Sequence, residues 1–222
     1  MRIGDVSFWY ADIGLPYRRA ALAGDTTADV AIIGAGYTGL WTAYYLKRAN
    51  PALDVLVIEK DFAGFGASGR NGGWLTGGFA WNHARYLETS SEHAVRAMVE
   101  AMNGTVDEVI RVAEAEGIEA DIQRTDELMV ATKPAQVGRM RGEVAHRRHW
   151  GEEGRVFEMN AADLAQRIRI PDALGAMVVT NVARVQPAKL VRGLARAVER
   201  LGVRIVEGTA VTAFEKGMVT TD

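Results

Sequence analysis

Asp29-Val-Ala-Ile-Ile-Gly-Ala-Gly-Tyr-Thr-Gly-Leu40 is the stretch of sequence that decides the fold. Its first six residues predict a buried strand, because a short apolar run with β-branched residues is stopped by glycine. Residues 37–50 predict a helix with one apolar face, which Pro51 ends. Residues 54–59 predict a second buried strand. Strand, tight glycine turn, helix and strand together predict a βαβ unit with parallel strands and a right-handed crossover.

Gly34, Gly36 and Gly39 have the spacing G-x-G-x-x-G, which is weak evidence alone in a chain with 24 glycines. Here the spacing follows a predicted strand, opens a predicted helix and precedes Glu59, which closes the second strand twenty residues after Gly39. In dinucleotide sites the three glycines allow a tight turn, close approach of a pyrophosphate and helix–strand packing. The helix N-terminus also favours phosphate. The alternative is a βαβ unit whose glycines serve packing only.

The acidic residue at the end of the second strand narrows the choice of dinucleotide. The Glu59 carboxylate can accept hydrogen bonds from ribose hydroxyls, and it would repel a 2′-phosphate. NADP is therefore disfavoured. The βαβ pattern does not separate FAD from NAD, because both carry an ADP moiety.

The rest of the chain also follows an α/β pattern, with exceptions in two segments. Residues 1–28 predict an irregular segment, and residues 60–78 contain seven glycines without a period. Asn160 is predicted to cap a short helix. Further helices are predicted over residues 91–117, 134–150 and 187–201, and further strands over residues 126–132, 176–180, 203–206 and 209–214.

Composition excludes several classes of function. With 26 basic and 28 acidic residues and a net charge of −2, we expect no nucleic-acid partner and no membrane surface. The chain has no cysteine, and its four histidines lack the spacing of a zinc motif, so we expect no metal. Residues 1–14 do not form a signal peptide, and no apolar run reaches the ~18–20 residues of a membrane span. The expected location is the cytoplasm.

Gly66-Ala-Ser-Gly-Arg-Asn-Gly-Gly73 is the second informative motif, and it follows closely after Glu59-Lys60. Together with the glycine fingerprint, these residues resemble the D-amino-acid/glycine oxidase (DAO) family of FAD-dependent oxidoreductases, nearest its γ-glutamylputrescine oxidase-like branch. The resemblance extends to Ser7-Phe-Trp-Tyr10 and to Val185-Gln-Pro-Ala-Lys-Leu190, so it covers nearly the whole chain.

The resemblance implies FAD as the cofactor and assigns residues to it by position. It places the fingerprint at the pyrophosphate, the end of the second strand at the adenosine ribose, and the second motif along the path to the isoalloxazine ring. The backbone of a late strand would contact adenine. The residues assigned to the cofactor are Gly34, Gly36, Tyr37, Thr38, Gly39, Glu59, Lys60, Ala67, Ser68, Arg70, Asn71, Gly72, Gly73 and Val211.

Residue chemistry suits three of these assignments. Ser68 and Asn71 can supply hydrogen bonds, and Arg70 can neutralise phosphate charge. The alternative for Arg70 is an exposed salt bridge. Because the chain has no cysteine and residues 60–73 contain no histidine, we expect FAD to be bound non-covalently.

The resemblance also implies a domain organisation. The expected fold is α/β, a Rossmann-like FAD-binding βαβ domain interrupted by part of an α+β substrate domain. Family members are longer, so we expect the N-terminal half only, with a C-terminal half as a missing partner. The expected segments are an N-terminal arm (1–28), the βαβ unit and glycine-rich loop (29–80), a partial substrate domain (81–180), and a return to the FAD-binding domain (181–222).

The function that the resemblance implies is oxidation of a small-molecule amine or amino acid to an imine, by hydride transfer to flavin N5 with oxygen as the acceptor. No catalytic residue is assigned. An NAD-dependent dehydrogenase is one alternative, since the fingerprint and Glu59 permit it, although the loop that ends at Gly73 has no evident role there. A non-catalytic, truncated or split half of a flavoprotein is the other alternative.

Overall fold

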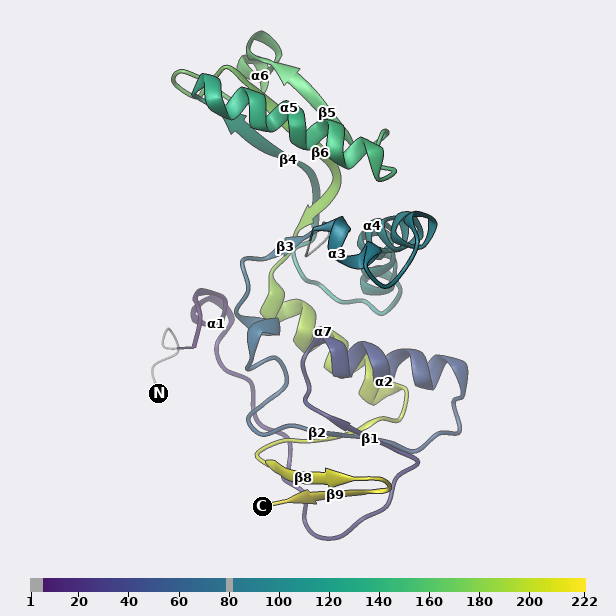
Figure 1. Cartoon of the computed structure of the whole chain (residues 1–222). Helices are drawn as coiled ribbons and strands as arrows, with labels where there is room; N and C mark the ends of the chain where they lie inside the picture. The colour runs from purple at the N-terminus through teal and green to yellow at the C-terminus, as the bar shows by residue number, and fades with distance from the viewer. Residues whose placement is uncertain (1–5, 79–81) are drawn as a thin grey trace. The chain divides into compact units, whose positions relative to one another are not determined.

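The computed structural model describes residues 6–78 and 82–222, and the chain divides into two compact units (Figure 1). Unit 1 contains Met1–Gly73, Val112–Ile122 and Val185–Asp222. Unit 2 contains Trp74–Arg111 and Gln123–Arg184. Unit 2 is therefore an insertion in the sequence of unit 1. Of the segments predicted above, residues 1–5 and 79–81 lie outside the described residues.

Unit 1 is built on a parallel sheet of β1 (Val30–Ile33), β2 (Val55–Ile58) and β7 (Arg204–Val206), in the order β1-β2-β7. Helix α2 (Tyr37–Ala49) connects β1 to β2, so the predicted βαβ unit with parallel strands is confirmed. Helix α7 (Pro187–Arg200) packs against α2 on the same side of the sheet (Figure 1).

An antiparallel hairpin of β8 (Val211–Glu215) and β9 (Met218–Thr221) follows β7 in unit 1. Backbone hydrogen bonds connect its approach to the end of β2, since the Gly208 N–H donates to the Asp61 carbonyl and the Thr209 N–H to the Glu59 carbonyl. The hairpin lies on the side of the sheet opposite α2 and α7 (Figure 1).

The prediction that both early strands are buried is correct for β2 and wrong for β1. All four residues of β2 are buried. In β1, Ala31 and Ile33 are exposed, and 51% of the Ile33 surface is accessible. The reason is position in the sheet: among the described residues β2 has a paired strand on each side, whereas β1 has one on only one side.

The prediction of an irregular N-terminal segment is wrong for α1 (Phe8–Ile13). Its N-cap is Ser7, whose side chain accepts a hydrogen bond from the Tyr10 backbone N–H, and its C-cap is Gly14 with a φ of 72°. A helix of six residues is too short to show a periodic pattern, and alone it would be unstable in water. Tertiary packing stabilises it, because Tyr10 is fully buried.

Unit 2 is built on an antiparallel sheet whose longest strand is β6 (Gly175–Arg184). This strand pairs with β3 (Trp74–Leu75), β4 (Gln123–Ala131) and β5 (Val156–Asn160). The helices of this unit are α3 (His83–Leu87), α5 (Pro134–His149), α6 (Ala161–Arg167) and the part of α4 (Glu92–Ala115) that ends at Arg111. Buried residues of α5, β5 and β6 form a common core: Val144, Val156, Met177, Val179 and Val182.

The sequence predicted most of these elements within a few residues. The predicted cap is confirmed, since the Asn160 Oδ1 accepts a hydrogen bond from the Asp163 backbone N–H at 2.9 Å. Helix α3 and strands β3 and β5 were not predicted. The sequence of β5, Val-Phe-Glu-Met-Asn, shows no clear alternation of apolar and polar residues, and only Val156 is buried.

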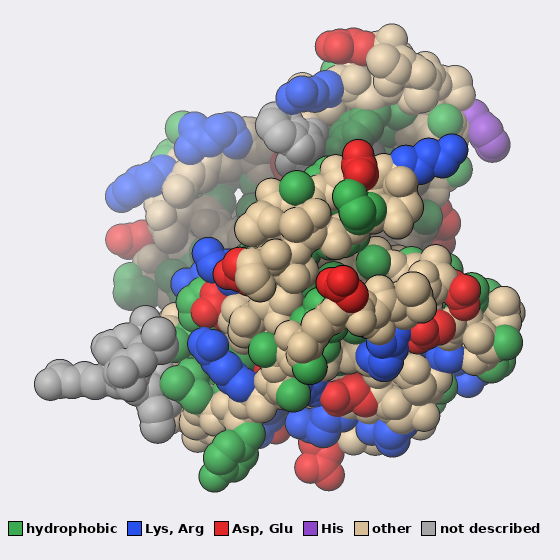
Figure 2. Space-filling model, turned by 90° about the horizontal axis from the view of Figure 1, so that it is seen from below, with side chains coloured by type: hydrophobic (Ala, Val, Ile, Leu, Met, Phe, Trp, Pro, Cys, Tyr) green, Lys and Arg blue, Asp and Glu red, His purple; other side chains and the backbone are tan. Residues whose placement is uncertain are grey.

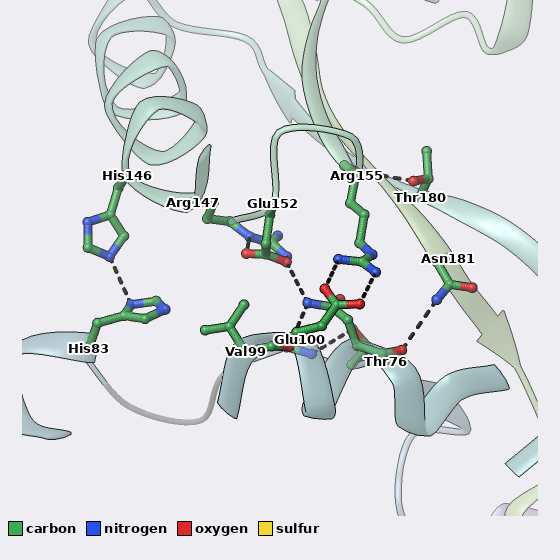
Figure 3. A network of polar contacts seen from close by, with 12 residues as sticks. Thr76, His83, Val99, Glu100, His146, Arg147, Glu152, Arg155, Thr180 and Asn181 are labelled. Carbon is green, nitrogen blue, oxygen red and sulfur yellow. Dashed lines mark hydrogen bonds and ion pairs between the residues drawn. The ribbon is translucent and has the colours of Figure 1, made fainter. Parts of the chain in front are cut away.

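A network of polar contacts connects three segments of unit 2 (Figure 3). Glu152 is buried, and its carboxylate accepts two hydrogen bonds from the Arg147 guanidinium, each 2.7 Å long. Asn103, on α4, donates a third hydrogen bond to the same carboxylate at 3.2 Å. A buried carboxylate needs such partners, because removing it from water is otherwise costly.

Two histidines meet beside this network, with the His83 Nδ1 3.0 Å from the His146 Nε2 (Figure 3). The His83 ring also stacks on Trp150, with ring centres 4.8 Å apart. Burial, and then the charge of His146, lower the pKa of His83 below its usual value, against the opposite influence of Glu152 and Glu143.

Acid should therefore destabilise unit 2. The unfolded chain binds a proton at His83 near pH 6.5, and the folded protein binds it only at lower pH, so the free energy of unfolding should fall as the pH drops below about 6.5. Urea denaturation at pH 7.5 and 5.5 measures this. His83→Phe, which keeps a ring against Trp150, should reduce the pH dependence, and His93→Gln, at an exposed position, should not. An unchanged pH dependence in His83→Phe would contradict the account.

Candidate dinucleotide site

The turn between β1 and α2 depends on two glycines. Gly34 has a φ of +96°, a conformation that side chains disfavour, and its N–H donates to the Ile58 carbonyl at 2.8 Å. At Gly39 an added Cβ would lie 2.1 Å from the Gly34 carbonyl oxygen and 3.1 Å from the Ile32 side chain. Glycine at these two positions therefore allows α2 to begin close against β1.

Glu59 lies at the carboxyl end of β2, directly beside this turn. Its Oε2 accepts a hydrogen bond from the Ala35 N–H at 2.8 Å, and its Oε1 accepts one from the Asp61 N–H at 2.9 Å. A carboxylate has about four acceptor positions, so two such bonds leave room for further donors. The role of the Ala35 amide was not predicted, because every residue except proline has a backbone N–H and the residue type does not show which one is used.

Ser68 connects the second motif to the first. Its Oγ accepts a hydrogen bond from the backbone N–H of Tyr37, the first residue of α2, at 2.8 Å. An added Cβ at Gly36 would lie 3.0 Å from the same oxygen. The structure thus brings Ser68 of the second motif to the N-terminus of α2, beside the first motif.

Arg70 and Asn71 lie on the exposed side of the loop. The Arg70 Nε donates to the Gly66 carbonyl at 3.3 Å, and its guanidinium lies 5.1 Å from the centre of the Phe65 ring. Over residues 6–78 and 82–222, no carboxylate lies within ion-pair distance of Arg70, so the alternative of a salt bridge finds no partner there. The Asn71 side chain donates to the Ser68 carbonyl at 3.0 Å and accepts from the Gly73 N–H at 2.8 Å.

The remaining residues assigned to the cofactor make fewer contacts with the turn between β1 and α2. Thr38, Lys60, Ala67 and Gly72 are exposed. Tyr37 turns its side chain toward α7, where its hydroxyl donates to the Pro187 carbonyl at 2.9 Å, and burial raises its pKa above the usual value. Gly73 is buried and has a φ of +73°. Val211 lines a separate shallow recess with Ile33, Thr212, Ala213 and Phe214.

The arrangement fits a pyrophosphate-bearing ligand. The first turn of α2 presents backbone N–H groups that have no partner within the helix, together with its positive end. Gly34, Gly66 and Gly72 border open space, since an added Cβ at any of them would meet no atom within 4 Å. Backbone donors, a carboxylate beside the turn and an exposed guanidinium are therefore in one unit of the fold.

Residues 29–222 match the sequence model of the family described as "DAO: FAD dependent oxidoreductase". The chain belongs to this family. The resemblance deduced from the two glycine-rich motifs is thereby confirmed, and the cofactor of the family is FAD rather than NAD.

Among the curated relatives that match most of the chain are two oxidoreductases. Gamma-glutamylputrescine oxidoreductase from Escherichia coli strain K12 is 30% identical over 190 residues, which are 85% of this chain and 43% of the relative. "Probable oxidoreductase OrdL" from Rhizobium meliloti strain 1021 is 32% identical over 212 residues, or 94% of this chain and 48% of the relative. The chain thus spans about half the length of the curated relatives it matches.

Solved structures confirm the predicted fold class. L-amino acid deaminase from Proteus myxofaciens superposes with a TM-score of 0.71 at 18% identity, covering 94% of this chain and 45% of its own. Glycine oxidase from Bacillus cereus has a TM-score of 0.63 at 21% identity, covering 87% and 52% respectively. At these identities the likeness concerns the fold alone.

The surface shows charges of both signs. Acidic and basic side chains are interspersed on the face that Figure 2 displays. Within the described ranges, no helix is long and apolar enough to cross a membrane. No group of three or more histidine, aspartate or glutamate side chains suited to a metal ion occurs in this part of the chain.

Proposed function

We propose that this chain is the FAD-binding part of a flavoenzyme that oxidises a small-molecule amine or amino acid to an imine, with oxygen as the electron acceptor. The observation that carries the proposal is the meeting of three segments at the start of α2. The Gly34 turn, the Glu59 carboxylate and the Ser68 hydroxyl are connected there by hydrogen bonds to the Ala35 and Tyr37 amides.

We propose that unit 1 holds FAD non-covalently. The α2 N-terminus would stabilise the pyrophosphate through its backbone N–H groups, and Arg70 would add a positive charge. Glu59 would accept hydrogen bonds from the adenosine ribose hydroxyls, and Val211 would place its backbone against adenine. The full set comprises Gly34, Gly36, Tyr37, Thr38, Gly39, Glu59, Lys60, Ala67, Ser68, Arg70, Asn71, Gly72, Gly73 and Val211. Unit 2 would then be part of the substrate domain.

Bound FAD supplies an acceptor for the hydride that leaves the substrate carbon beside nitrogen. The residues of this chain bind and orient the cofactor. The name of one relative, gamma-glutamylputrescine oxidoreductase, supports the class of substrate. The proposed activity concerns the whole protein, because this chain spans about half of its curated relatives.

Anaerobic reduction of the flavin tests the substrate class. The FAD-loaded protein is mixed with primary amines, secondary amines, amino acids and, as the matched control, the corresponding hydroxy acids. Loss of the visible flavin absorbance is expected with a nitrogen compound alone, and admitting air should restore the absorbance and produce hydrogen peroxide. Reduction by a hydroxy acid or by NADH, with none by any nitrogen compound, would contradict the proposal.

A further inference from the structure

We propose that helix α1 holds the loop of residues 64–73 in the shape that receives FAD, which makes Ser7, Trp9 and Tyr10 positioning residues for the cofactor. These three residues are called the α1 clamp below. The proposal rests on the proposed FAD site, and it gives a role to the Ser7-Phe-Trp-Tyr10 motif beyond resemblance.

Each side chain of the α1 clamp donates a hydrogen bond to a carbonyl of the loop. The Ser7 Oγ donates to Gly69 at 3.2 Å, and the Tyr10 hydroxyl donates to Gly64 at 3.0 Å. The Trp9 Nε1 donates to the Asn71 carbonyl at 2.6 Å. Three donors within four consecutive residues thus bind three points of one loop, which fixes the backbone at its start, middle and end.

Helix α1 also lies close to three glycines of the loop. An added Cβ at Gly69 would lie 2.5 Å from the Tyr10 hydroxyl, and one at Gly73 would lie 3.0 Å from the Trp9 ring. Gly64 has a φ of +82° and would place a Cβ 3.2 Å from the Tyr10 hydroxyl. Other atoms lie nearer still: the Gly64 carbonyl oxygen is 2.3 Å from an added Cβ at Gly69, the Val185 carbonyl oxygen is 2.5 Å from one at Gly73, and Val191 is 2.3 Å from one at Gly64. Helix α1 is therefore one of several neighbours that leave no room for side chains at these positions.

The fixed carbonyls alternate with the residues proposed to meet FAD. Gly69 lies between Ser68 and Arg70, and Asn71 follows Arg70 directly, so fixing these two carbonyls also fixes the backbone that carries the Ser68 and Arg70 side chains. A glycine-rich loop loses much conformational entropy when it becomes ordered. A loop ordered before binding gives tighter binding, because the ligand does not have to order it.

The α1 clamp is itself fixed to α7. The Arg192 guanidinium lies 4.9 Å from the centre of the Tyr10 ring and donates to the Gly14 carbonyl at the end of α1. The Gln186 side chain, at the N-cap of α7, donates to the Trp9 carbonyl at 3.2 Å. The α1 clamp thus connects the loop of residues 64–73 to α7, a largely buried helix.

Conservative substitutions test the α1 clamp without removing its packing. Tyr10→Phe keeps the ring and removes the hydroxyl, which also interacts with Arg192, and Trp9→Phe keeps an aromatic ring but removes the indole N–H together with part of the ring system. Phe8→Ala is the matched control, because Phe8 lies in the same helix and 77% of its surface is exposed. Each donor loss should weaken FAD binding roughly three- to tenfold, as expected for one hydrogen bond, and Phe8→Ala should leave it unchanged.

Two measurements show whether the α1 clamp acts on FAD binding by ordering the loop. The dissociation constant for FAD is measured by flavin fluorescence, and hydrogen exchange of residues 64–73 is measured without FAD. Faster exchange confined to this loop, with weaker FAD binding, supports the proposal. Unchanged exchange and affinity in both Trp9→Phe and Tyr10→Phe overturn it, as does faster exchange with unchanged affinity.

A parent chain that binds no FAD would contradict the proposed function separately. In that case hydrogen exchange alone decides on the clamp. Faster exchange of the loop in the donor variants than in Phe8→Ala would support α1 as its positioning element, and equal exchange would overturn the proposal.

Discussion

Gly39→Ala should abolish detectable FAD binding and lower the stability of unit 1. The new methyl group would lie 2.1 Å from the Gly34 carbonyl oxygen, and this contact is relieved only if α2 moves away from β1. Such overpacking destabilises by about 3 kcal/mol. The movement would also displace the helix N-terminus from Ser68 and Glu59. Urea denaturation and FAD titration measure the two effects.

Gly138→Ala is the control for this prediction. Gly138 lies within α5, and an added Cβ there would meet no atom within 4 Å. Alanine in a helix interior is favoured over glycine by roughly 0.5–1 kcal/mol, so this variant should be slightly more stable and bind FAD as the parent does. If Gly39→Ala matched Gly138→Ala in both measurements, the close packing of α2 on β1 would be wrong.

Arg19→Met should destabilise unit 1 by about 3–5 kcal/mol, because it leaves a buried carboxylate without its charged partner. The Glu207 side chain is fully buried, and its carboxylate accepts hydrogen bonds from the Arg19 backbone N–H and guanidinium, each 2.7 Å long. The Ala63 N–H donates a third at 2.9 Å. This cluster connects the N-terminal segment to the end of β7 and to Ala63, the residue before the loop of residues 64–73.

Arg18→Met provides the matched control for the second prediction. The Arg18 guanidinium lies 3.4 Å from the Asp61 carboxylate, with 53% of the Arg18 side chain exposed, and exposed pairs of this kind contribute about 0–1 kcal/mol. Denaturant titration of both variants measures the difference in unfolding free energy. A loss in Arg19→Met no larger than that in Arg18→Met would show that Glu207 does not depend on its partner.

The βαβ core was predictable because its signals are local. A glycine that ends an apolar run, a helix with one apolar face and an acidic residue after the next strand all lie between Asp29 and Glu59. The burial of β1 was not predictable from the same residues. The same apolar run would suit a strand paired on one side or on both sides. The exposure of Ile33 therefore depends on which strands neighbour β1 in the sheet.

The contacts around the site depend on partners far apart in the sequence. Arg19 and Glu207 are 188 residues apart, and the donors of the α1 clamp are 54 to 62 residues from the carbonyls that they bind. Carbonyl acceptors give no signal in the residue type, so neither Trp9 nor Tyr10 could be connected to the loop from the sequence. The resemblance identified Ser7-Phe-Trp-Tyr10 and Gly66–Gly73 as motifs, and the structure shows the hydrogen bonds between these two segments.

The visible absorbance spectrum of the purified 222-residue chain, recorded after incubation with FAD and removal of the excess, shows whether this chain holds the cofactor. The account predicts a flavin spectrum at one FAD per chain, with all of the FAD released on denaturation and identified by chromatography. A folded chain that remains colourless, or that retains NAD in place of FAD, would contradict it.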